Sequence, residues 1–259
     1  MVGKAENFVH SREKRQQIKA RKEEKISSFL LDETFSTSAL IAKLIDTTQT
    51  TAYRTLKKME SQGLVKMHEE GLSLGRSGKQ VIWGLTPTGA LLATDPNSEN
   101  FKVDFYEVGR VKPVTIEHSL DVQAVRITAL KNGWTEWQPS RKVHRMAQED
   151  RATWLQVPDA IAKSPEGFQV AFEVERTIKT PKRYDAILSN FAQMMQDGTI
   201  QKVFYISPEK ICPRIERLFR SIKKITLYDG NEKRVMATPE GLFKRFTFIT
   251  YEQWEKQEW

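Results

Sequence analysis

Three carboxylates near the middle of the chain have a spacing that could support catalysis or cation binding. Asp159 lies in a short β-like run from residue 155 to 162, and Glu173 and Glu175 end a second run that begins at residue 168. Alternate side chains of a strand point to the same face, so Glu173 and Glu175 share one. A hairpin with its turn at residues 164–167 would bring Asp159 beside them.

Such a cluster indicates a cation site, because carboxylates gathered on one sheet face repel one another. A hard cation between them removes the repulsion, and Mg²⁺ binds carboxylate oxygens together with water. A cation held in this way suits phosphodiester cleavage, where it activates water and neutralises charge on the phosphate. The alternative is that Glu173 and Glu175 form the solvated face of an edge strand.

The pattern around these acids resembles a known nuclease core. An acidic residue on one strand, a tight turn and an acid-x-acid sequence on the next strand are similar to the restriction-endonuclease-like PD-(D/E)xK fold. The run E-V-E-R-T at residues 173–177, followed by Arg183 and Tyr184, resembles the replication-relaxation family and its MobC-type plasmid mobilisation relaxases more narrowly. The resemblance covers most of the chain, because the preceding domain also fits.

The resemblance implies roles for the acidic residues. Asp159 and Glu173 match metal ligands for Mg²⁺ or Mn²⁺, and the backbone carbonyl of Val174 would be a third ligand. Glu175 stands where the nuclease superfamily usually has lysine. This departure leaves Glu175 to bind a second metal or to orient water.

The missing positive charge predicts a displaced lysine. Lys182, at the start of the following helix, is the first choice, with Lys179 and Arg183 behind it. The alternative is that these residues only form a basic helix start. By resemblance, His118 matches a family histidine with a catalytic role, although a single histidine is more often structural.

Two other cleavage routes follow from the histidines and tyrosines. The common relaxase class binds its metal through closely spaced histidines, and the four histidines here, at positions 10, 68, 118 and 144, form no such pair. That class is therefore disfavoured. Tyr184 follows the acidic cluster, which leaves a covalent tyrosyl intermediate open.

Residues 32–93 are predicted to form a winged helix. Apolar residues at helical spacing follow Thr37, and a second helix begins after Thr48 and ends at Gly63. Two wing strands, at 65–69 and 81–85, and a closing helix complete the motif. The pattern T-x-x-T-A-Y-R-x-L-K-K-M-E-x-x-G-L-V resembles the recognition helices of winged-helix DNA-binding domains, although some winged helices bind only protein.

The exposed side chains of the second helix suit duplex DNA. Early residues of a recognition helix reach base edges, while lysine and arginine bind phosphates. The predicted contacts are Gln49, Thr50, Tyr53, Arg54, Lys57 and Lys58 on the helix, with Arg76 and Lys79 on the wing.

Charge and composition agree with a nucleic-acid partner. The 259 residues allow two domains, the net charge is +8 and the pI is about 9.4. One cysteine, Cys212, excludes a disulfide framework and favours a reducing, cytoplasmic location. No apolar run approaches the roughly 20 residues that a membrane span needs, so membrane insertion is not expected.

The sequence thus predicts an α/β (α+β) protein. A basic arm or helix at 1–31 precedes the winged helix at 32–93, a linker at 94–112 and a nuclease-like αβββαβ domain at 113–259. The arm would lie on DNA phosphates or, alternatively, be a solvated helix face. Basic residues 141–151 would hold the cleaved strand or, alternatively, form a solvated loop.

The favoured function is a metal-dependent, site-specific DNA-nicking relaxase acting at a plasmid transfer origin. By resemblance, it would deliver the strand to a conjugative coupling protein of a type IV secretion system. The alternative is a winged-helix regulator or replication-control protein whose nuclease-like domain is inactive. A third reading is a restriction-type or repair nuclease that cuts both strands without a transfer origin.

Overall fold

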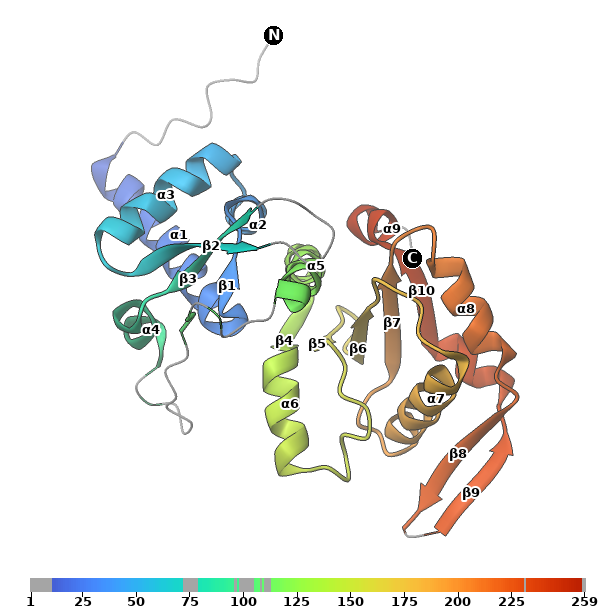
Figure 1. Cartoon of the computed structure of the whole chain (residues 1–259). Coiled ribbons are helices and arrows are strands. Elements are labelled where there is room, and N and C mark those ends of the chain that lie inside the picture. The colour runs from blue at the N-terminus through green and yellow to red at the C-terminus, as the bar shows by residue number, and fades with distance from the viewer. Residues whose placement is uncertain are drawn as a thin grey trace. The chain divides into compact units, whose positions relative to one another are not determined.

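The computed structural model describes residues 11–71, 79–95, 97, 105–107, 109, 113–230 and 232–257. The chain divides into two compact units, Met1–Gln123 and Ala124–Trp259 (Figure 1). Both units combine helices with a sheet, which confirms the predicted mixed α/β class. None of the helices in the described ranges is long and apolar enough to cross a membrane.

The first unit has a helix–turn–helix followed by a β-hairpin. Its strands pair antiparallel in the order β1-β3-β2. Thr48 caps the second helix of the pair by accepting a hydrogen bond from the Thr51 N–H, as predicted. The elements are α1 (Arg12–Glu33), β1 (Phe35–Ser36), α2 (Ser38–Leu44), α3 (Gln49–Ser61), β2 (Val65–Gly71), β3 (Lys79–Leu85) and α4 (Pro87–Ala93). This order agrees with the predicted winged helix.

Helix α1 belongs to this unit and is not a separate arm. Its basic N-terminal part is mostly exposed, whereas Ile26, Phe29 and Leu30 near its C-terminal end are buried. Helix α1 contacts α4, β1 and β3. The predicted boundary at residue 31 therefore falls inside a helix that is packed against the sheet.

The first unit extends into helix α5 (Pro113–Lys131), beyond the predicted boundary at residue 113. Ile116 and Leu120 pack against Phe35 and Tyr106 of this unit. A glycine permits the approach of Tyr106, because a Cβ at Gly84 would lie 2.3 Å from the Cβ of Tyr106. The apolar residues of α5 thus belong to two units. The sequence pattern predicted one apolar stripe and did not show where one unit ends and the next begins.

Buried polar side chains join Tyr106 to the hairpin, and burial of His68 among them is expected to make this unit less stable in acid. The His68 and Tyr106 rings meet edge to face with centroids 4.6 Å apart, and the Tyr106 hydroxyl donates to Glu70. Burial lowers the pKa of His68 below its ordinary value of 6.5. Protonation therefore favours the unfolded chain, and stability falls as the pH drops below about 6.5.

We expect His68→Gln to weaken this pH dependence. The free energy of unfolding should fall less between pH 7 and pH 5 in the variant than in the wild type, measured by urea denaturation. Equal slopes for the two proteins would show that His68 does not cause the acid sensitivity.

The second unit is built on a five-stranded mixed sheet with strand order β10-β7-β6-β5-β4. Strands β4, β5 and β6 pair antiparallel, and β6, β7 and β10 run parallel. The elements are β4 (Thr135–Pro139), α6 (Ser140–Glu149), β5 (Ala160–Lys163), β6 (Gln169–Val174), α7 (Pro181–Gln196), β7 (Lys202–Ser207), α8 (Cys212–Ser221), β10 (Phe246–Thr250) and α9 (Tyr251–Lys256). The predicted strand–turn–strand at 155–174 is present, with its first strand shorter than expected.

Each face of this sheet carries its own core. Ile161, Ala171, Val203 and Tyr205 pack in one cluster with residues of α7 and α8, including Phe191. An aromatic cluster joins the alternate side chains Phe172 and Phe204 to Trp134, Trp137 and Trp254. Because both faces of β6 are covered, its single buried acid Glu173 is exceptional.

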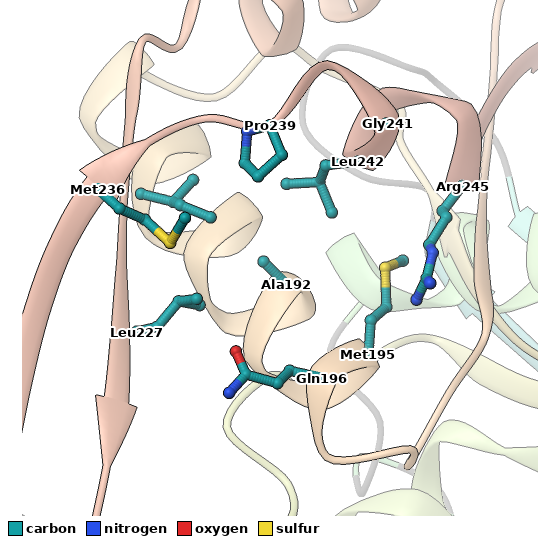
Figure 2. A pocket seen from close by; sticks show the side chains of 10 residues that line it. Ala192, Met195, Gln196, Leu227, Met236, Pro239, Gly241, Leu242 and Arg245 are labelled. Carbon is teal, nitrogen blue, oxygen red and sulfur yellow. The ribbon is translucent and has the colours of Figure 1, made fainter.

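A two-stranded hairpin stands beside the main sheet. It consists of β8 (Lys224–Asp229) and β9 (Glu232–Ala237) and is followed by the 3₁₀ helix η1 (Glu240–Arg245). The backbone N–H groups of Thr226 and Tyr228 donate to Ser189 Oγ at 3.1 Å and to Gln193 Oε1 at 2.7 Å. These bonds attach β8 to α7, and a pocket lies between α7, the hairpin and η1 (Figure 2).

Candidate active site and nucleic-acid interface

Asp159 and Glu173 lie together, as the sequence predicts. Ala160 pairs with Phe172, so extending the register by one residue places Asp159 opposite Glu173. Asp159 precedes β5, and its backbone N–H donates to the Phe172 carbonyl at 2.9 Å. Its Oδ2 accepts the Val174 N–H at 2.8 Å, which fixes the carboxylate at the end of β6.

Glu173 is a buried acid with a strongly altered protonation equilibrium. Glu173 is 5% exposed. Burial, the larger cause, and the charge of Asp159, the second cause, raise its pKa to about 8. Gln156 Nε2 donates to Glu173 Oε1 at 3.1 Å. A buried acid with a raised pKa next to a second carboxylate is typical of sites that bind cations or transfer protons.

Tyr205 adds a buried hydroxyl to the same face. It pairs with Glu173 in the parallel register of β6 and β7, so the two side chains point the same way. Among the described residues its hydroxyl has no hydrogen-bond partner, and burial raises its pKa, as does the charge of Glu173. A buried unpaired hydroxyl beside an acid is a feature that calls for a ligand or water.

Glu175 is neutralised by a lysine of its own loop. The Glu175 N–H continues the β6–β7 pairing by donating to the Ile206 carbonyl at 3.0 Å, and its carboxylate forms an ion pair with Lys179. Burial lowers the pKa of Lys179, while the charges of Glu173 and Asp159 oppose this effect. Lys179, the second choice from the sequence, is therefore the lysine in contact with the acidic cluster, and the charge of Arg183 also lowers the pKa of Glu173.

Lys182 does not take this place. It lies exposed in the first turn of α7, and the contacts with the acids come from Lys179. The loop before α7 turns Lys179 back toward β6, and its N–H donates to the Tyr184 hydroxyl at 3.1 Å. The sequence showed three nearby cations but not the direction of this loop.

This geometry gives a prediction that separates the two lysines. If the cluster cleaves DNA, Lys179→Met should lower the single-turnover nicking rate by about a hundredfold, because a half-buried cation beside the reacting phosphate is lost. Lys182→Met should change the rate by only a few-fold. The reverse order of effects would place the required cation at residue 182.

The donor set fits a hard divalent cation with two protein ligands, not the three predicted. Within the described ranges, no group of three or more His, Cys, Asp or Glu side chains is arranged to hold a metal ion. Glu175 is directed to Lys179, which leaves Asp159 and Glu173, whose repulsion a cation would relieve. Bound there, Mg²⁺ or Mn²⁺ would supply positive charge for the phosphate and a more acidic water.

The catalytic role of His118 stays a prediction, and Tyr184 is not placed as a nucleophile. His118 is half-buried in the part of α5 that belongs to the first unit, and the acids belong to the second. Tyr184 is fully buried, burial raises its pKa, and its hydroxyl accepts the Lys179 N–H. A buried tyrosine with a raised pKa is a poor nucleophile, which argues against a covalent tyrosyl route.

Helix α3 presents its predicted DNA-binding residues to solvent. Ala52, Leu56 and Met59 are buried on its inner face. The exposed residues are Gln49, Thr50, Tyr53, Arg54, Lys57 and Lys58. Lys79, at the base of the wing, is exposed and pairs with Glu69 at 2.8 Å. Arg76 lies outside the described residues.

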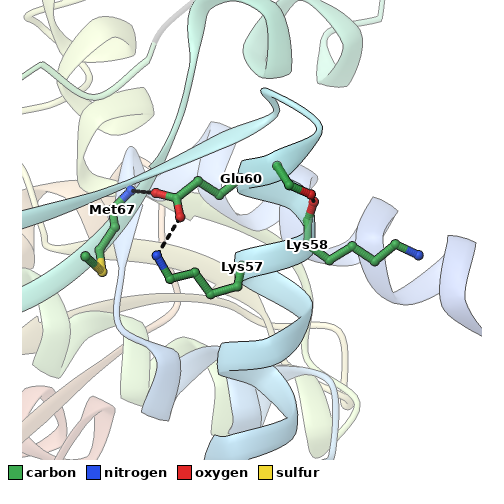
Figure 3. A network of polar contacts seen from close by, with 5 residues as sticks. Lys57, Lys58, Glu60 and Met67 are labelled. Carbon is green, nitrogen blue, oxygen red and sulfur yellow. Dashed lines mark hydrogen bonds and ion pairs between the residues drawn. The ribbon is translucent and has the colours of Figure 1, made fainter.

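Two of these side chains are held by neighbours. Lys57 Nζ binds Glu60 Oε2 at 2.8 Å, and Glu60 Oε1 accepts the Met67 N–H of β2 at 3.1 Å (Figure 3). The Tyr53 ring lies edge-on to Trp83, with centroids 5.7 Å apart. Within the described residues, Arg54 and Lys58 are thus the cations of α3 that no acidic side chain holds in an ion pair, unlike Lys57.

Helix α1 contributes a cation to this surface. The Lys58 side chain meets Lys19 of α1, and this contact lowers the pKa of Lys58. Lys19 also forms an ion pair with Glu23 at 3.4 Å. The basic part of α1 therefore reaches the exposed face of α3 at Lys19.

Together, the fold and these two sites define a protein with a basic helix–turn–helix unit and an α/β unit that carries a buried acidic cluster. The description of the replication-relaxation family matches residues 28–206, which include most of the first unit and strands β4 to β7 of the second. The chain belongs to this family. Membership indicates a role in plasmid replication or mobilisation. No curated protein and no solved structure matches the chain.

Proposed function

We propose that the chain is a DNA-nicking relaxase of the MobC type, in which the first unit binds duplex DNA at a plasmid transfer origin and the second cuts one strand. The observation that carries the proposal is the buried Glu173 opposite the half-buried Asp159, with Lys179 beside them. A buried acid that faces a second carboxylate costs stability, so a purely structural protein gains nothing from it. The arrangement at the end of β6 is consistent with the PD-(D/E)xK resemblance.

The residues divide the reaction between them. Asp159 and Glu173 would hold Mg²⁺ or Mn²⁺ and orient water toward the phosphate. Lys179 lies where it would offset charge that develops on the phosphate, and Glu175 keeps it in place. The buried Tyr205 hydroxyl would donate a hydrogen bond to a bound water or to Glu173. The nicked strand would then pass to a conjugative coupling protein, as the family resemblance suggests.

A second function is a DNA-binding regulator with an inactive nuclease-like domain. The observation that favours it is the ion pair between Glu175 and Lys179, which leaves only two carboxylates for a metal. Such a protein would bind DNA through α3 and never cut it. Asp159 and Glu173 would then destabilise the fold without serving a reaction.

A nicking assay on supercoiled plasmid tests the proposal. Plasmids with and without a candidate transfer origin would be incubated with Mg²⁺, Mn²⁺ or EDTA, using wild type and Asp159→Ala. We expect open circles that require the origin and the metal and are lost in the variant. Binding without a nick under every condition would favour the regulator, and linear DNA without origin dependence would indicate a general nuclease.

A further inference from the structure

The pocket beside the β8–β9 hairpin has the composition of a docking site for an apolar group. It encloses about 430 Å³ between α7, the hairpin and η1 (Figure 2). Met195, Leu227, Met236 and Leu242 supply most of its apolar wall. This size is in the range of ligand pockets, and methionine side chains adapt to differently shaped apolar groups.

The walls are held in position by hydrogen bonds, so the pocket does not depend on a loosely packed loop. The Tyr228 and Thr226 N–H groups bind Gln193 and Ser189 of α7. On the other side, the Thr238 N–H donates to the Lys223 carbonyl at 2.9 Å, which closes the base of the hairpin. An apolar cavity that is braced in this way remains available to a partner.

Positive charge lies next to this apolar wall. Arg245 lines the pocket and is exposed, and it forms no ion pair within the part of the chain that the structure describes. Lys233 and Arg234 of β9 are also exposed. The acids Asp229 and Glu232 stand at the tip of the hairpin. Glu240 begins η1 beside the lining residue Gly241, whereas Lys244 and Arg245 end it, so η1 keeps a net positive charge.

Strand β9 adds an open edge to the pocket. In the described sheets, β9 pairs only with β8, so its second edge has no strand partner. Met236 of the same strand enters the pocket wall. An unpaired edge offers backbone donors and acceptors to an extended peptide, and a neighbouring pocket gives such a peptide a side-chain anchor.

We propose that β9 and this pocket bind an extended, acidic segment of a partner protein. The segment adds a strand to β9, places one large apolar side chain among Met195, Met236 and Leu242, and directs a carboxylate to Arg245. The open edge favours a peptide over a small amphipathic acid, which would use only the pocket. The hairpin and η1 follow residue 206, the last one matched by the family description, and the site does not depend on cleavage of DNA.

Methyl NMR of the full chain tests this docking site. The seven methionines would be labelled at the methyl carbon, and the probe would be the capped peptide acetyl-Glu-Asp-Leu-Asp-Glu-amide. We expect the Met195 and Met236 signals to shift, with a Kd of about 1 mM for so small a ligand. Replacing the acids by their amides, or leucine by serine, should weaken binding by about tenfold or more.

Two variants locate the contact. Gly241 lines the pocket and a Cβ there meets no atom within 4 Å, so Gly241→Trp should fold normally and block the peptide. Arg245→Ala should weaken binding, whereas Lys244→Ala, the neighbouring exposed cation, should not. No shift of Met195 or Met236, equal binding of the amide peptide, or tighter binding of octanoate than of the peptide would each overturn the proposal.

Discussion

Glu173→Gln is expected to abolish strand nicking and at the same time to stabilise the protein. The amide keeps the shape of the side chain but cannot serve as an anionic metal ligand, so the nicking rate should fall on the order of 10³-fold. DNA binding by α3 should be unchanged, because the substitution leaves the first unit intact.

The gain in stability follows from the raised pKa of Glu173. Its folded-state pKa of about 8 lies above the ordinary 4.5, so the ionised form destabilises the fold as the pH rises between these values. The variant lacks this ionisation. In EDTA at pH 9 its free energy of unfolding should exceed that of the wild type by at least about 1 kcal/mol. At pH 4 the difference should vanish.

A matched acid in the same sheet provides the control. Glu166 lies exposed in the turn between β5 and β6, and the hydrogen bond with Ser164 lowers its pKa, so Glu166→Gln should leave nicking and the pH dependence of stability above its ordinary pKa of 4.5 unchanged. If Glu173→Gln nicked DNA like the wild type, or showed no gain of stability at pH 9, the acidic pair would not be the active site.

Arg54→Glu is expected to remove most DNA binding. Arg54 is exposed on α3 and is not engaged like Lys57, so a reversed charge there would face a DNA phosphate or base directly. We expect an affinity loss of about 10- to 100-fold or more and a shallower dependence of log K on log salt. Fluorescence anisotropy with labelled duplex at several salt concentrations measures both.

The control for this variant reverses a charge elsewhere. Lys210 is exposed before α8 in the second unit, so Lys210→Glu changes the net charge equally without touching α3. It should retain nearly all of the affinity. Equal losses for the two variants would mean that net charge, and not the α3 surface, attracts the DNA.

Local signals in the sequence were enough to predict the helix–turn–helix and the hairpin of the first unit. Thr48 before an apolar-periodic segment and Gly63 after it marked α3, and both are found at its ends. The exposed face followed from helical spacing alone. The sequence did not reveal that α5 begins in this unit, because an apolar stripe shows that a helix is packed but not against what.

The acidic site could be predicted only in part. Asp159 and Glu173 meet because strand alternation and a short turn determine their faces, and both are sequence-local rules. Tyr205 and Gln156 were missed, because Tyr205 depends on the parallel register of β6 with β7 and Gln156 on an irregular loop. The pairing of Lys179 with Glu175 was missed as well, because it depends on how the loop before α7 turns, and the spacing of residues in the sequence does not show this.

Mapping the position of the nick tests the central claim most directly. Plasmid carrying a transfer origin would be treated with wild type and Mg²⁺, and primer extension would be run on each strand, with Glu173→Gln in parallel. We expect one break, on one strand, at one position within the origin, and none with the variant. Breaks scattered over both strands, or no break although the duplex is bound, would contradict it.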